Sequence, residues 1–431
     1  MSERTISVDY LARVEGEGAL RVRVADGRVE DVELRIFEPP RFFEAFLRGR
    51  HFAEAPDITA RICGICPVAY QMSSCHAMEA MLGLAVPEPV RALRRLLYCG
   101  EWIESHALHV YLLHAPDFLG YPDAIHLAKD HPKMVQDGLA LKKAGNALMT
   151  LVGGREIHPV NVRVGGFYRC PTREELEDLR PALTDALTIA EATVRFAAAL
   201  EFPSVDEEYE FVALRHPTEY PMNEGRVVSN RGLDLPMDRF EEAIEEVHVP
   251  HSNALHAQRR GGGAYLVGPL ARYALNHDHL GPRATAIVRE VGLEPVVRNP
   301  FRSILVRAVE MVYACEEALR LVAAYRRPER PFVERETPFP GGTASWITEA
   351  PRGMLYHRYR VAPSGLIEEA RIVAPTSQNQ RRIEEDLRHL VERSLDRDDG
   401  ALTDLCERAI RNHDPCISCA THFLTLDVQR S

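Results

Sequence analysis

The sequence predicts a mainly α-helical fold with smaller β elements, an α+β class with a helical core and an N-terminal β-hairpin. Its 431 residues, 45% of them apolar, can fill a sizeable hydrophobic core. Several long segments repeat apolar residues at helical spacing, whereas one stretch near the N-terminus alternates apolar and polar residues. Together these observations indicate a globular chain in which helices dominate.

The hairpin is predicted over residues 18–36, GALRVRVADGRVEDVELRI. Apolar residues alternate with polar ones on both sides of Asp26 and Gly27. An Asp-Gly pair between two alternating stretches favours a tight hairpin turn.

The helices follow in chain order, and several begin after proline or threonine, as helix starts commonly do. The predicted segments are 67–84, 87–114, 134–151, 172–200, 302–326 and 376–395. Residues 261–263 (GGG) and 328–342 (PERPFVERETPFPGG) are predicted to be loops, because glycine and proline interrupt regular structure. The sequence shows no internal repeat and no low-complexity linker.

Charge and hydropathy exclude two classes of protein. The formal net charge is −11 and the basic residues are scattered, which argues against a nucleic-acid-binding surface. No uncharged apolar run is long enough to span a bilayer, and the first twenty residues do not resemble a secretion signal. We therefore expect an acidic cytoplasmic protein without a membrane span.

Nine cysteines in such a chain favour metal or redox chemistry, because the cytosol keeps thiols reduced. Lone cysteines are most often small buried hydrophobic residues, and five stand alone: Cys75, Cys99, Cys170, Cys315 and Cys406. The other four form two C-x-x-C pairs, Cys63 with Cys66 and Cys416 with Cys419. Two such pairs can place four thiolates around one metal ion.

Spacing alone leaves a structural zinc site open, although such sites usually close short loops rather than joining the two ends of a long chain. A thioredoxin-like redox role is weaker, because neither pair lies in a short strand-helix unit. The neighbouring residues favour a reactive centre. Arg61 precedes the first pair and Asp414 the second, and Arg352 lies in a stiff turn between proline and glycine.

Five motifs occur together along the chain: RVEGEG, RICGIC, EAPRG, PTSQNQ and DPCISC followed after two residues by histidine. In this combination and order the sequence resembles the large catalytic subunit of nickel-iron hydrogenases, from about residue 10 to residue 422. The flanks RICGICPVAYQMSS and PTSQNQ are most similar to the soluble, bidirectional NAD(P)-coupled branch, which includes the sulfhydrogenase alpha subunits.

The resemblance implies the hydrogenase large-subunit fold and a nickel-iron centre. By this resemblance Cys63, Cys66, Cys416 and Cys419 bind nickel, and Cys66 and Cys419 also bridge to an iron that carries cyanide and carbon monoxide. Thiolates suit this task because they are soft, electron-rich donors.

The resemblance also implies the residues around the metals. Arg352 matches the family's arginine over the open site, and Pro351, Asp117 and Asp414 match its surroundings, with the two carboxylates orienting the guanidinium. A rigid cation and a base are what heterolytic cleavage of dihydrogen requires.

Glu15 matches the acid that begins the proton path. The Cys419 thiolate and the Arg352 guanidine remain rival first bases, and the high pKa of arginine is an objection to the second. One position departs from the family pattern: Tyr70 stands where a histidine usually hydrogen-bonds a bridging sulfur, so a tyrosine hydroxyl is expected to take that place.

At the C-terminus the resemblance implies maturation. His422 matches the residue that becomes the new terminus and, with Glu44, helps to bind a magnesium ion. A maturation protease would remove residues 423–431 after nickel-insertion proteins have loaded the site. Residues 1–422 would then form a single interlocked catalytic unit, because the metal site joins its N-terminal and C-terminal motifs.

The implied function is reversible cleavage of H2 to protons and electrons. The five remaining cysteines lack iron-sulfur spacing, so we expect an iron-sulfur small subunit, with further iron-sulfur, FAD and NAD(P) subunits. The complex would be of the H2:NAD(P)+ type, and sulfur or polysulfide reduction is a second activity implied for it. The alternatives are a non-catalytic scaffold like that of respiratory complex I, which the four cysteines argue against, and a four-cysteine zinc protein.

Overall fold

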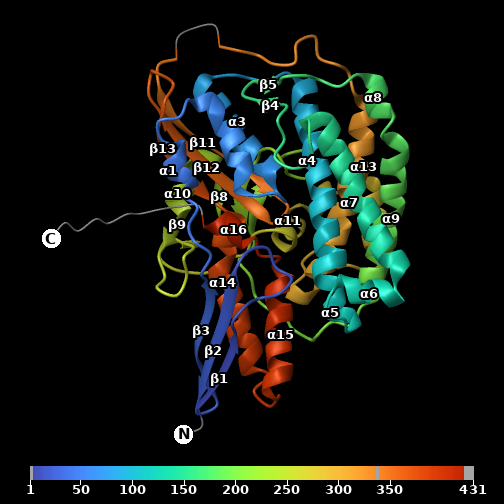
Figure 1. Ribbon diagram of the computed structural model, residues 1–431, viewed down its shortest axis with the longest axis vertical. Helices are drawn as coiled ribbons and strands as arrows, with labels where there is room; N and C mark the ends of the chain where they lie inside the picture. The colour runs from blue at the N-terminus through green and yellow to red at the C-terminus, as the bar shows by residue number, and fades with distance from the viewer. Residues whose placement is uncertain (1–2, 336–338, 422–431) are drawn as a thin grey trace, which may run out of the picture.

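The computed structural model describes residues 3–335 and 339–421. Figure 1 shows three parts: a bundle of long helices on one side, a three-stranded sheet with α3 on the other, and a second three-stranded sheet near the N-terminus. The mainly α fold with smaller sheets is therefore confirmed. In the part of the chain that is described, no helix is long and apolar enough to cross a membrane.

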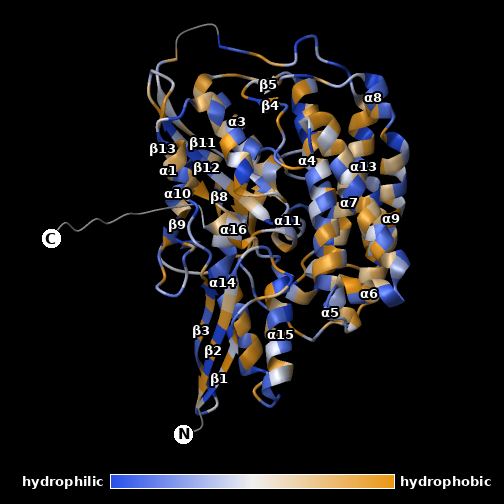
Figure 2. Ribbon diagram, viewed as in Figure 1, coloured by the Kyte–Doolittle hydropathy of each residue, from blue (hydrophilic) through white to orange (hydrophobic). Residues whose placement is uncertain are grey.

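The bundle consists of α4 (Glu88–Ala107), α7 (Pro132–Gly153), α9 (Arg180–Ala198) and α13 (Ser303–Ala324). These helices carry both hydrophobic and hydrophilic residues (Figure 2), and their hydrophobic side chains contribute to the largest core of the protein. Helices α4 and α7 approach closely through glycines, since a Cβ on Gly145 would lie 2.5 Å from the carbonyl oxygen of Gly100.

The central sheet comprises β11 (Gly342–Ala350), β12 (Gly353–Val361) and β13 (Ile367–Val373), paired antiparallel in this order. Helix α3 (Pro67–Leu82) packs against β11 and β12. Ala350 and Gly353 close the ladder of the β11–β12 hairpin. Its two-residue turn, Pro351–Arg352, therefore lies at a fixed end of a buried sheet.

The N-terminal sheet comprises β1 (Glu3–Val8), β2 (Gly18–Ala25) and β3 (Arg28–Ile36), also antiparallel. Asp26 and Gly27 adopt φ values of 50° and 71°, the left-handed conformation that a type I′ hairpin turn needs. The predicted hairpin is confirmed, and β1 extends it to three strands. Helices α14 (Pro375–Glu392) and α15 (Asp399–Asn412) share a second hydrophobic core with this sheet.

Four of the predicted helical segments correspond to single helices, namely α3, α7, α13 and α14. The segment 172–200 is two helices, because Pro181 lies in the first turn of α9 and starts it separately from α8. The segment 87–114 is helical throughout, but its last seven residues, Leu108–His114, are wound as a π-helix. Residues 261–263 form a loop, as predicted.

The remaining elements are short and connect these parts. The helices are α1 (Phe43–Leu47), α2 (Ala55–Thr59), α5 (Ala115–Leu119), α6 (Ala124–Asp130), α8 (Arg173–Glu177), α10 (Phe240–Ala243), α11 (Pro269–Asn276), α12 (Pro282–Glu290) and α16 (Ile417–Ala420). The strands are β4 (Val162–Arg163), β5 (Gly166–Phe167), β6 (Val212–Arg215), β7 (Arg226–Ser229), β8 (Asp234–Leu235), β9 (Ile244–Val247) and β10 (His256–Arg259).

Candidate metal centre

The two C-x-x-C pairs meet where the N-terminal and C-terminal parts of the chain lie side by side. Cys66 immediately precedes α3, and Cys416 immediately precedes α16. The backbone amide of Ile417 donates to the carbonyl oxygen of Glu15 at 2.9 Å, which ties the C-terminal pair to the N-terminal segment.

The four sulfurs form one compact, buried group. The Sγ atoms of Cys63 and Cys416 are 3.5 Å apart, those of Cys66 and Cys419 3.7 Å, and those of Cys416 and Cys419 2.8 Å. Four sulfurs at about 2.3 Å from one tetrahedral metal ion would be about 3.8 Å apart. Two of the three distances match this value, so the four side chains fit around a thiophilic metal ion.

The protonation of these thiols depends on their neighbours. Hydrogen bonds from the other cysteines, that of Cys416 foremost, lower the pKa of Cys63 well below its usual value. Burial raises the pKa of Cys416 far above it. Four thiolates cannot therefore coexist in this group without a compensating cation, which is the demand that a bound metal meets.

Arg352 is buried beside this group on the β11–β12 turn. Its Nε donates to the carbonyl oxygen of Asp414 at 2.9 Å and its Nη2 to Oδ1 of the same residue at 3.0 Å. Burial alone would lower the pKa of Arg352, but the Asp414 carboxylate and the cysteine sulfurs outweigh it and raise the pKa well above its usual value. The guanidinium is therefore a permanent cation. Pro351 precedes it in the same turn, as predicted.

Asp117 does not orient this guanidinium. Its carboxylate instead accepts from Arg13 at 2.5 Å and from Arg411 at 2.7 and 2.9 Å. The second side-chain contact of Arg352 is with Ser105, whose Oγ lies 3.5 Å from Nη1. The structure thus corrects the prediction of two orienting carboxylates: Asp414 holds the guanidinium, and Ser105 on α4 occupies the other position.

Glu15 touches the centre directly. Its Oε2 accepts from the Cys416 thiol at 3.0 Å and from the Ser418 amide at 3.1 Å, and burial raises the pKa of this carboxyl. The Ser418 hydroxyl donates in turn to Glu38 at 3.0 Å. These contacts lead from a sulfur of the centre to the half-buried Glu38.

Tyr70 lies on the first turn of α3, and its hydroxyl donates to the carbonyl oxygen of Cys419 at 3.4 Å. A tyrosine hydroxyl therefore reaches the backbone of a predicted bridging cysteine. A second neighbour, Glu101 on α4, was not found by sequence reasoning. Its buried carboxylate accepts from the amides of Val68 and Ala69 at 2.6 and 3.2 Å and caps α3 next to Cys66. Glu101 is one of several charged residues in α4, and nothing in the sequence around it distinguishes it as a neighbour of the metal centre.

Glu44 lies apart from the sulfurs, on α1, where its carboxylate accepts from the Ile372 amide at 2.7 Å. Burial raises its pKa to about 8. The predicted partner, His422, and the predicted extension 423–431 lie outside the described residues. The carbonyl oxygen of Thr421, the last described residue, accepts from the amide of Arg41 at 2.6 Å. Arg41 lies three positions before Glu44 in the chain, so the C-terminal segment ends near Glu44.

Comparison with known proteins gives one consistent result. The sequence profile of the family described as nickel-dependent hydrogenase matches residues 41–137 and 255–422. The chain is 34% identical to sulfhydrogenase 1 subunit alpha of Pyrococcus furiosus, over 98% of both chains. It is 35% identical to sulfhydrogenase 2 subunit alpha of the same organism, over 98% of this chain and 100% of the other.

Among solved structures, the fold is similar to that of an NAD+-reducing [NiFe]-hydrogenase in the H2-reduced state. The TM-score is 0.87 at 26% identity, and the superposition covers 97% of this chain and 99% of the other.

Proposed function

Because this chain belongs to the nickel-dependent hydrogenase family, we propose that its four cysteines hold the nickel-iron centre of a hydrogenase catalytic subunit. The reaction is the reversible cleavage of H2 into two protons and two electrons. The observation that carries the proposal is the convergence of Cys63, Cys66, Cys416 and Cys419 beneath the buried cation of Arg352. When bound, the metals supply the site at which H2 is polarised and its electrons are accepted.

The individual ligand roles are part of the proposal. Cys66 and Cys419 would hold both nickel and an iron with cyanide and carbon monoxide ligands, whereas Cys63 and Cys416 would hold nickel alone. The resemblance to the family supports this assignment, and the distance of 3.7 Å between the Cys66 and Cys419 sulfurs is short enough for both to reach one pair of metals.

Protons leave through the sulfurs and Glu15. Since Arg352 stays charged, a cysteine thiolate is the better first base. Cys419 is our candidate, and its sulfur lies 2.8 Å from that of Cys416, which would relay the proton. Glu15 accepts from the Cys416 thiol at 3.0 Å and is therefore placed to pass the proton on. Glu15→Gln should lower H2 turnover by about 10² to 10⁴ at unchanged nickel and iron content, and turnover near that of the parent protein would exclude this path.

Glu44 and His422 are proposed to hold a magnesium ion near the end of the mature chain. A carboxylate oxygen suits magnesium, which prefers hard ligands. The half-buried Glu44 carboxylate, with a raised pKa, supports the proposal because a bound cation would favour its charged form. Magnesium analysis of the Glu44→Gln variant tests it: the ion should be absent.

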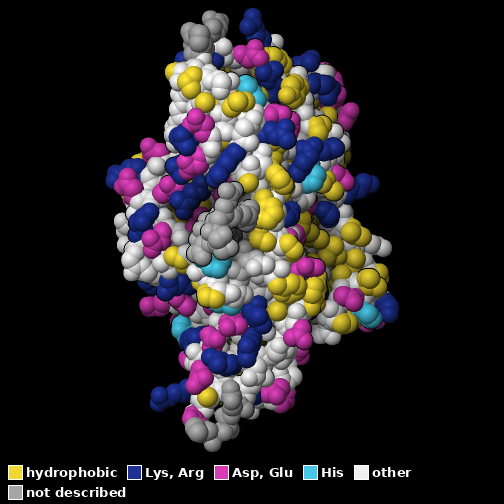
Figure 3. All heavy atoms as spheres, turned by 60° about the vertical axis from the view of Figure 1, so that its left-hand side comes forward, with side chains coloured by type: hydrophobic (Ala, Val, Ile, Leu, Met, Phe, Trp, Pro, Cys, Tyr) yellow, Lys and Arg dark blue, Asp and Glu magenta, His cyan; other side chains and the backbone are white. Residues whose placement is uncertain are grey.

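Electrons leave through partner subunits, of which an iron-sulfur small subunit is the first. Large apolar side chains are exposed on the chain, and one face shows them as patches between charged residues (Figure 3). The exposed apolar side chains include Ile157, which lies 3.8 Å from the position of a Cβ built on Gly64. Gly64 lies in the turn between Cys63 and Cys66. We propose that the small subunit docks beside this turn, within a short electron-transfer distance.

Further flavin and iron-sulfur subunits would pass the electrons to NAD(P) in the cytoplasm, as the similarity to an NAD+-reducing hydrogenase supports. The sulfhydrogenase relatives support sulfur or polysulfide reduction by the same complex. If the isolated chain alone reduced NAD(P) with H2, the proposal of partner subunits would be wrong.

Infrared spectroscopy with metal analysis tests the function. Purified complex should contain about one nickel and one iron atom for the large subunit beyond the iron-sulfur iron, and should show bands of cyanide and carbon monoxide. Zinc in place of nickel would support a structural four-cysteine zinc site, and a metal-free chain would support a non-catalytic scaffold subunit. The Cys419→Ser variant, lacking one sulfur, serves as the matched control and should lose the bands.

A further inference from the structure

We propose that Arg272 and Trp102 are positioning residues that hold the turn carrying Arg352 in place above the metal centre. This inference rests on the proposed role of Arg352. Neither residue touches the cysteines in a contact that the structure shows, and neither belongs to a motif that the sequence singled out. Their action is on the backbone of the β11–β12 turn.

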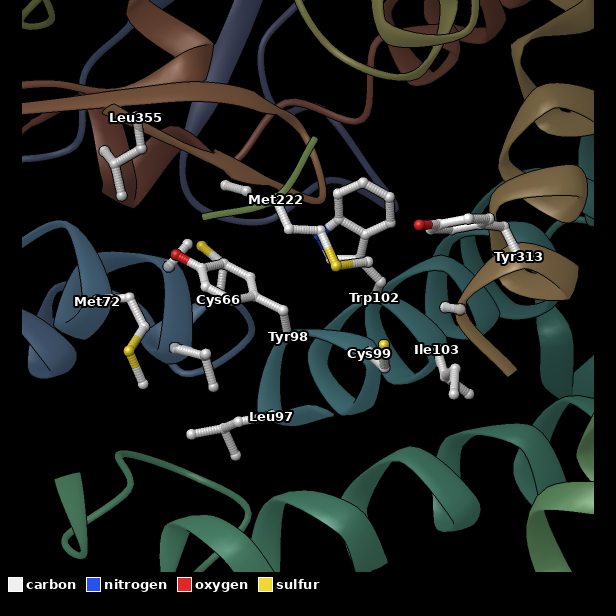
Figure 4. Close-up of a cluster of buried hydrophobic side chains, with 14 of the residues drawn as sticks. Cys66, Met72, Leu97, Tyr98, Cys99, Trp102, Ile103, Met222, Tyr313 and Leu355 are labelled. Atoms are coloured by element: carbon white, nitrogen blue, oxygen red, sulfur yellow. The ribbon is translucent and has the colours of Figure 1, made fainter. Parts of the chain in front are cut away.

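Together the two side chains bind three consecutive carbonyl groups. Trp102 Nε1 donates to the carbonyl oxygen of Glu349 at 3.1 Å. Arg272 donates from Nη1 to the carbonyl of Ala350 and from Nη2 to that of Pro351, both at 2.7 Å. Figure 4 shows Trp102 on α4, and both Trp102 and Met222 belong to the largest hydrophobic core. The peptide units that lead into Arg352 are thus fixed by two different helices, α4 and α11.

All five N–H groups of the Arg272 guanidinium have an acceptor. Besides the two carbonyls, Nε and Nη2 donate to Glu310 at 2.9 and 2.7 Å, and Nη1 donates to Glu349 at 3.0 Å. The guanidinium also lies over the Trp102 ring, 4.4 Å from its centroid. Arg272, Glu310 and Glu349 are all fully buried, so these bonds are not exchanged with solvent.

The carboxylate of Glu310 is itself held by other helices and loops. His106 contacts its Oε2 at 2.9 Å, and the Tyr220 hydroxyl donates to Oε1 at 2.8 Å. The Arg272 and His106 contacts, together with the charges of these side chains, outweigh burial and lower the pKa of Glu310 to about 2, so it is an anion at neutral pH. The guanidinium therefore rests on a fixed counter-ion.

The space around the turn leaves little room for adjustment. A Cβ on Gly268 would lie 2.7 Å from the carbonyl oxygen of Arg352, and one on Gly353 would lie 2.6 Å from a methyl group of Val267. A backbone shift of about 1 Å would lengthen the 2.9 and 3.0 Å bonds from Arg352 to Asp414 beyond hydrogen-bond range. Misplacement on that scale can cost about 10² in turnover.

The test compares Arg272→Lys with Arg94→Lys in the assembled complex. Arg94 is equally buried and donates from Nη1 and Nη2 to Glu79 at 2.7 and 2.5 Å, but its partners lie away from the turn. A lysine ammonium has three donors on a flexible stem, so it cannot reproduce the five bonds of Arg272 or the paired bonds of Arg94 to Glu79. Both variants should unfold at lower temperature. Only Arg272→Lys should lose about 10² in H2 turnover per bound nickel and shift the infrared bands of the iron ligands.

A milder variant covers the case in which Arg272→Lys does not fold. Trp102→Phe removes the bond to Glu349 but no charge, and should lower turnover per nickel about tenfold with the same shift of the infrared bands. Equal turnover per nickel in the Arg272, Arg94 and Trp102 variants would overturn the inference. The Arg352→Lys variant distinguishes failure of the proposed role of Arg352 from failure of the positioning role. If Arg352→Lys also kept full turnover, the proposed role of Arg352 would be wrong. If only Arg352→Lys lost turnover, the positioning role of Arg272 and Trp102 alone would be refuted.

Discussion

Arg352 binds Asp414 through two different nitrogens, one contacting the backbone carbonyl and the other the carboxylate. A planar guanidinium can make both bonds at once, and a lysine ammonium on a flexible stem cannot hold the same position. We predict that Arg352→Lys keeps nickel and iron content near normal but lowers H2 turnover by about 10² or more. Metal analysis and H2-oxidation rates on the same sample check this.

The matched control for this prediction is Arg61→Lys, since Arg61 lies two residues before the first cysteine pair but is exposed. It should change turnover little. A fully metallated Arg352→Lys variant with turnover like that of Arg61→Lys would contradict the role of the buried guanidinium.

Glu246 lies on β9 with a side chain that is 8% exposed, and its carboxyl makes the stability of the fold depend on pH. Burial raises its pKa from 4.5 to about 7, so the folded chain keeps a proton that the unfolded chain has released. The stabilisation is complete below about pH 4.5 and is lost as pH rises through about 7, which amounts to about 3 kcal/mol. We predict that Glu246→Gln flattens this fall in the free energy of unfolding, measured by urea titration between pH 5 and pH 8.

The control is Glu245→Gln, on the opposite face of the same strand, where the carboxylate pairs with Arg260 at a partly exposed site. Its free energy of unfolding should still fall between pH 5 and pH 8, because Glu246 is still present. If the free energy of unfolding of Glu246→Gln fell with pH as steeply as that of the parent chain, the Glu246 carboxyl would not be the cause of the pH dependence.

Residue types with distinctive spacing could be identified from the sequence alone, and others could not. The four cysteines and the Pro351–Arg352 turn lie together as expected, because C-x-x-C and Pro-x-Gly spacing restrict local geometry. Asp117 was assigned to Arg352 wrongly, and Ser105 was missed. The π-helical stretch Leu108–His114 lies between them, and the wider winding of a π-helix turns the residues after it to a different side.

At the scale of elements, helices α4 and α7 are in close contact through two glycines. A Cβ on Gly145 would lie 2.5 Å from the Gly100 carbonyl oxygen and 2.8 Å from the Glu104 amide nitrogen, both backbone atoms that cannot move independently. We predict that Gly145→Ala destabilises the chain by about 1–3 kcal/mol through overpacking, despite the better helix propensity of alanine. Thermal unfolding measures the loss.

The control is Gly400→Ala in the first turn of α15, where the new Cβ would be 3.4 Å from Asp398 Oδ1, an ordinary contact. That change should leave stability unchanged or raise it slightly. Equal effects of the two substitutions would show that the helices can separate, and would refute the packing argument.

Helices with a regular apolar period were predictable, and the central sheet was not. Strand β12 is buried on both faces for most of its length, so it lacks the alternation that marks a half-buried strand. Helix α15 was not predicted, although its 14 residues carry an apolar stripe at helical spacing that packs against the N-terminal sheet.

At the scale of the whole molecule, the metal centre joins the two ends of the chain. The Cys416 amide donates to Thr376 Oγ1 at 2.9 Å, and the C-terminal pair is buried where α16 packs against α14. Residues 1–422 thus act as one catalytic unit in our proposal. Metals must enter before this segment closes, because the closed cluster leaves its sulfurs inaccessible.

This order of events gives the last prediction, that active protein ends at His422 and lacks residues 423–431. Thr421, which precedes the extension, is buried, and its carbonyl oxygen accepts from the Arg41 amide, so the end of the catalytic unit is already packed into the fold. Removal of the extension after nickel insertion is what the resemblance to the family implies. Intact-mass spectrometry of active complex measures the chain end. The Cys416→Ser variant, in which nickel binding is impaired, should accumulate the uncut chain. Full-length protein with complete nickel and full turnover would refute processing but leave the hydrogenase assignment intact.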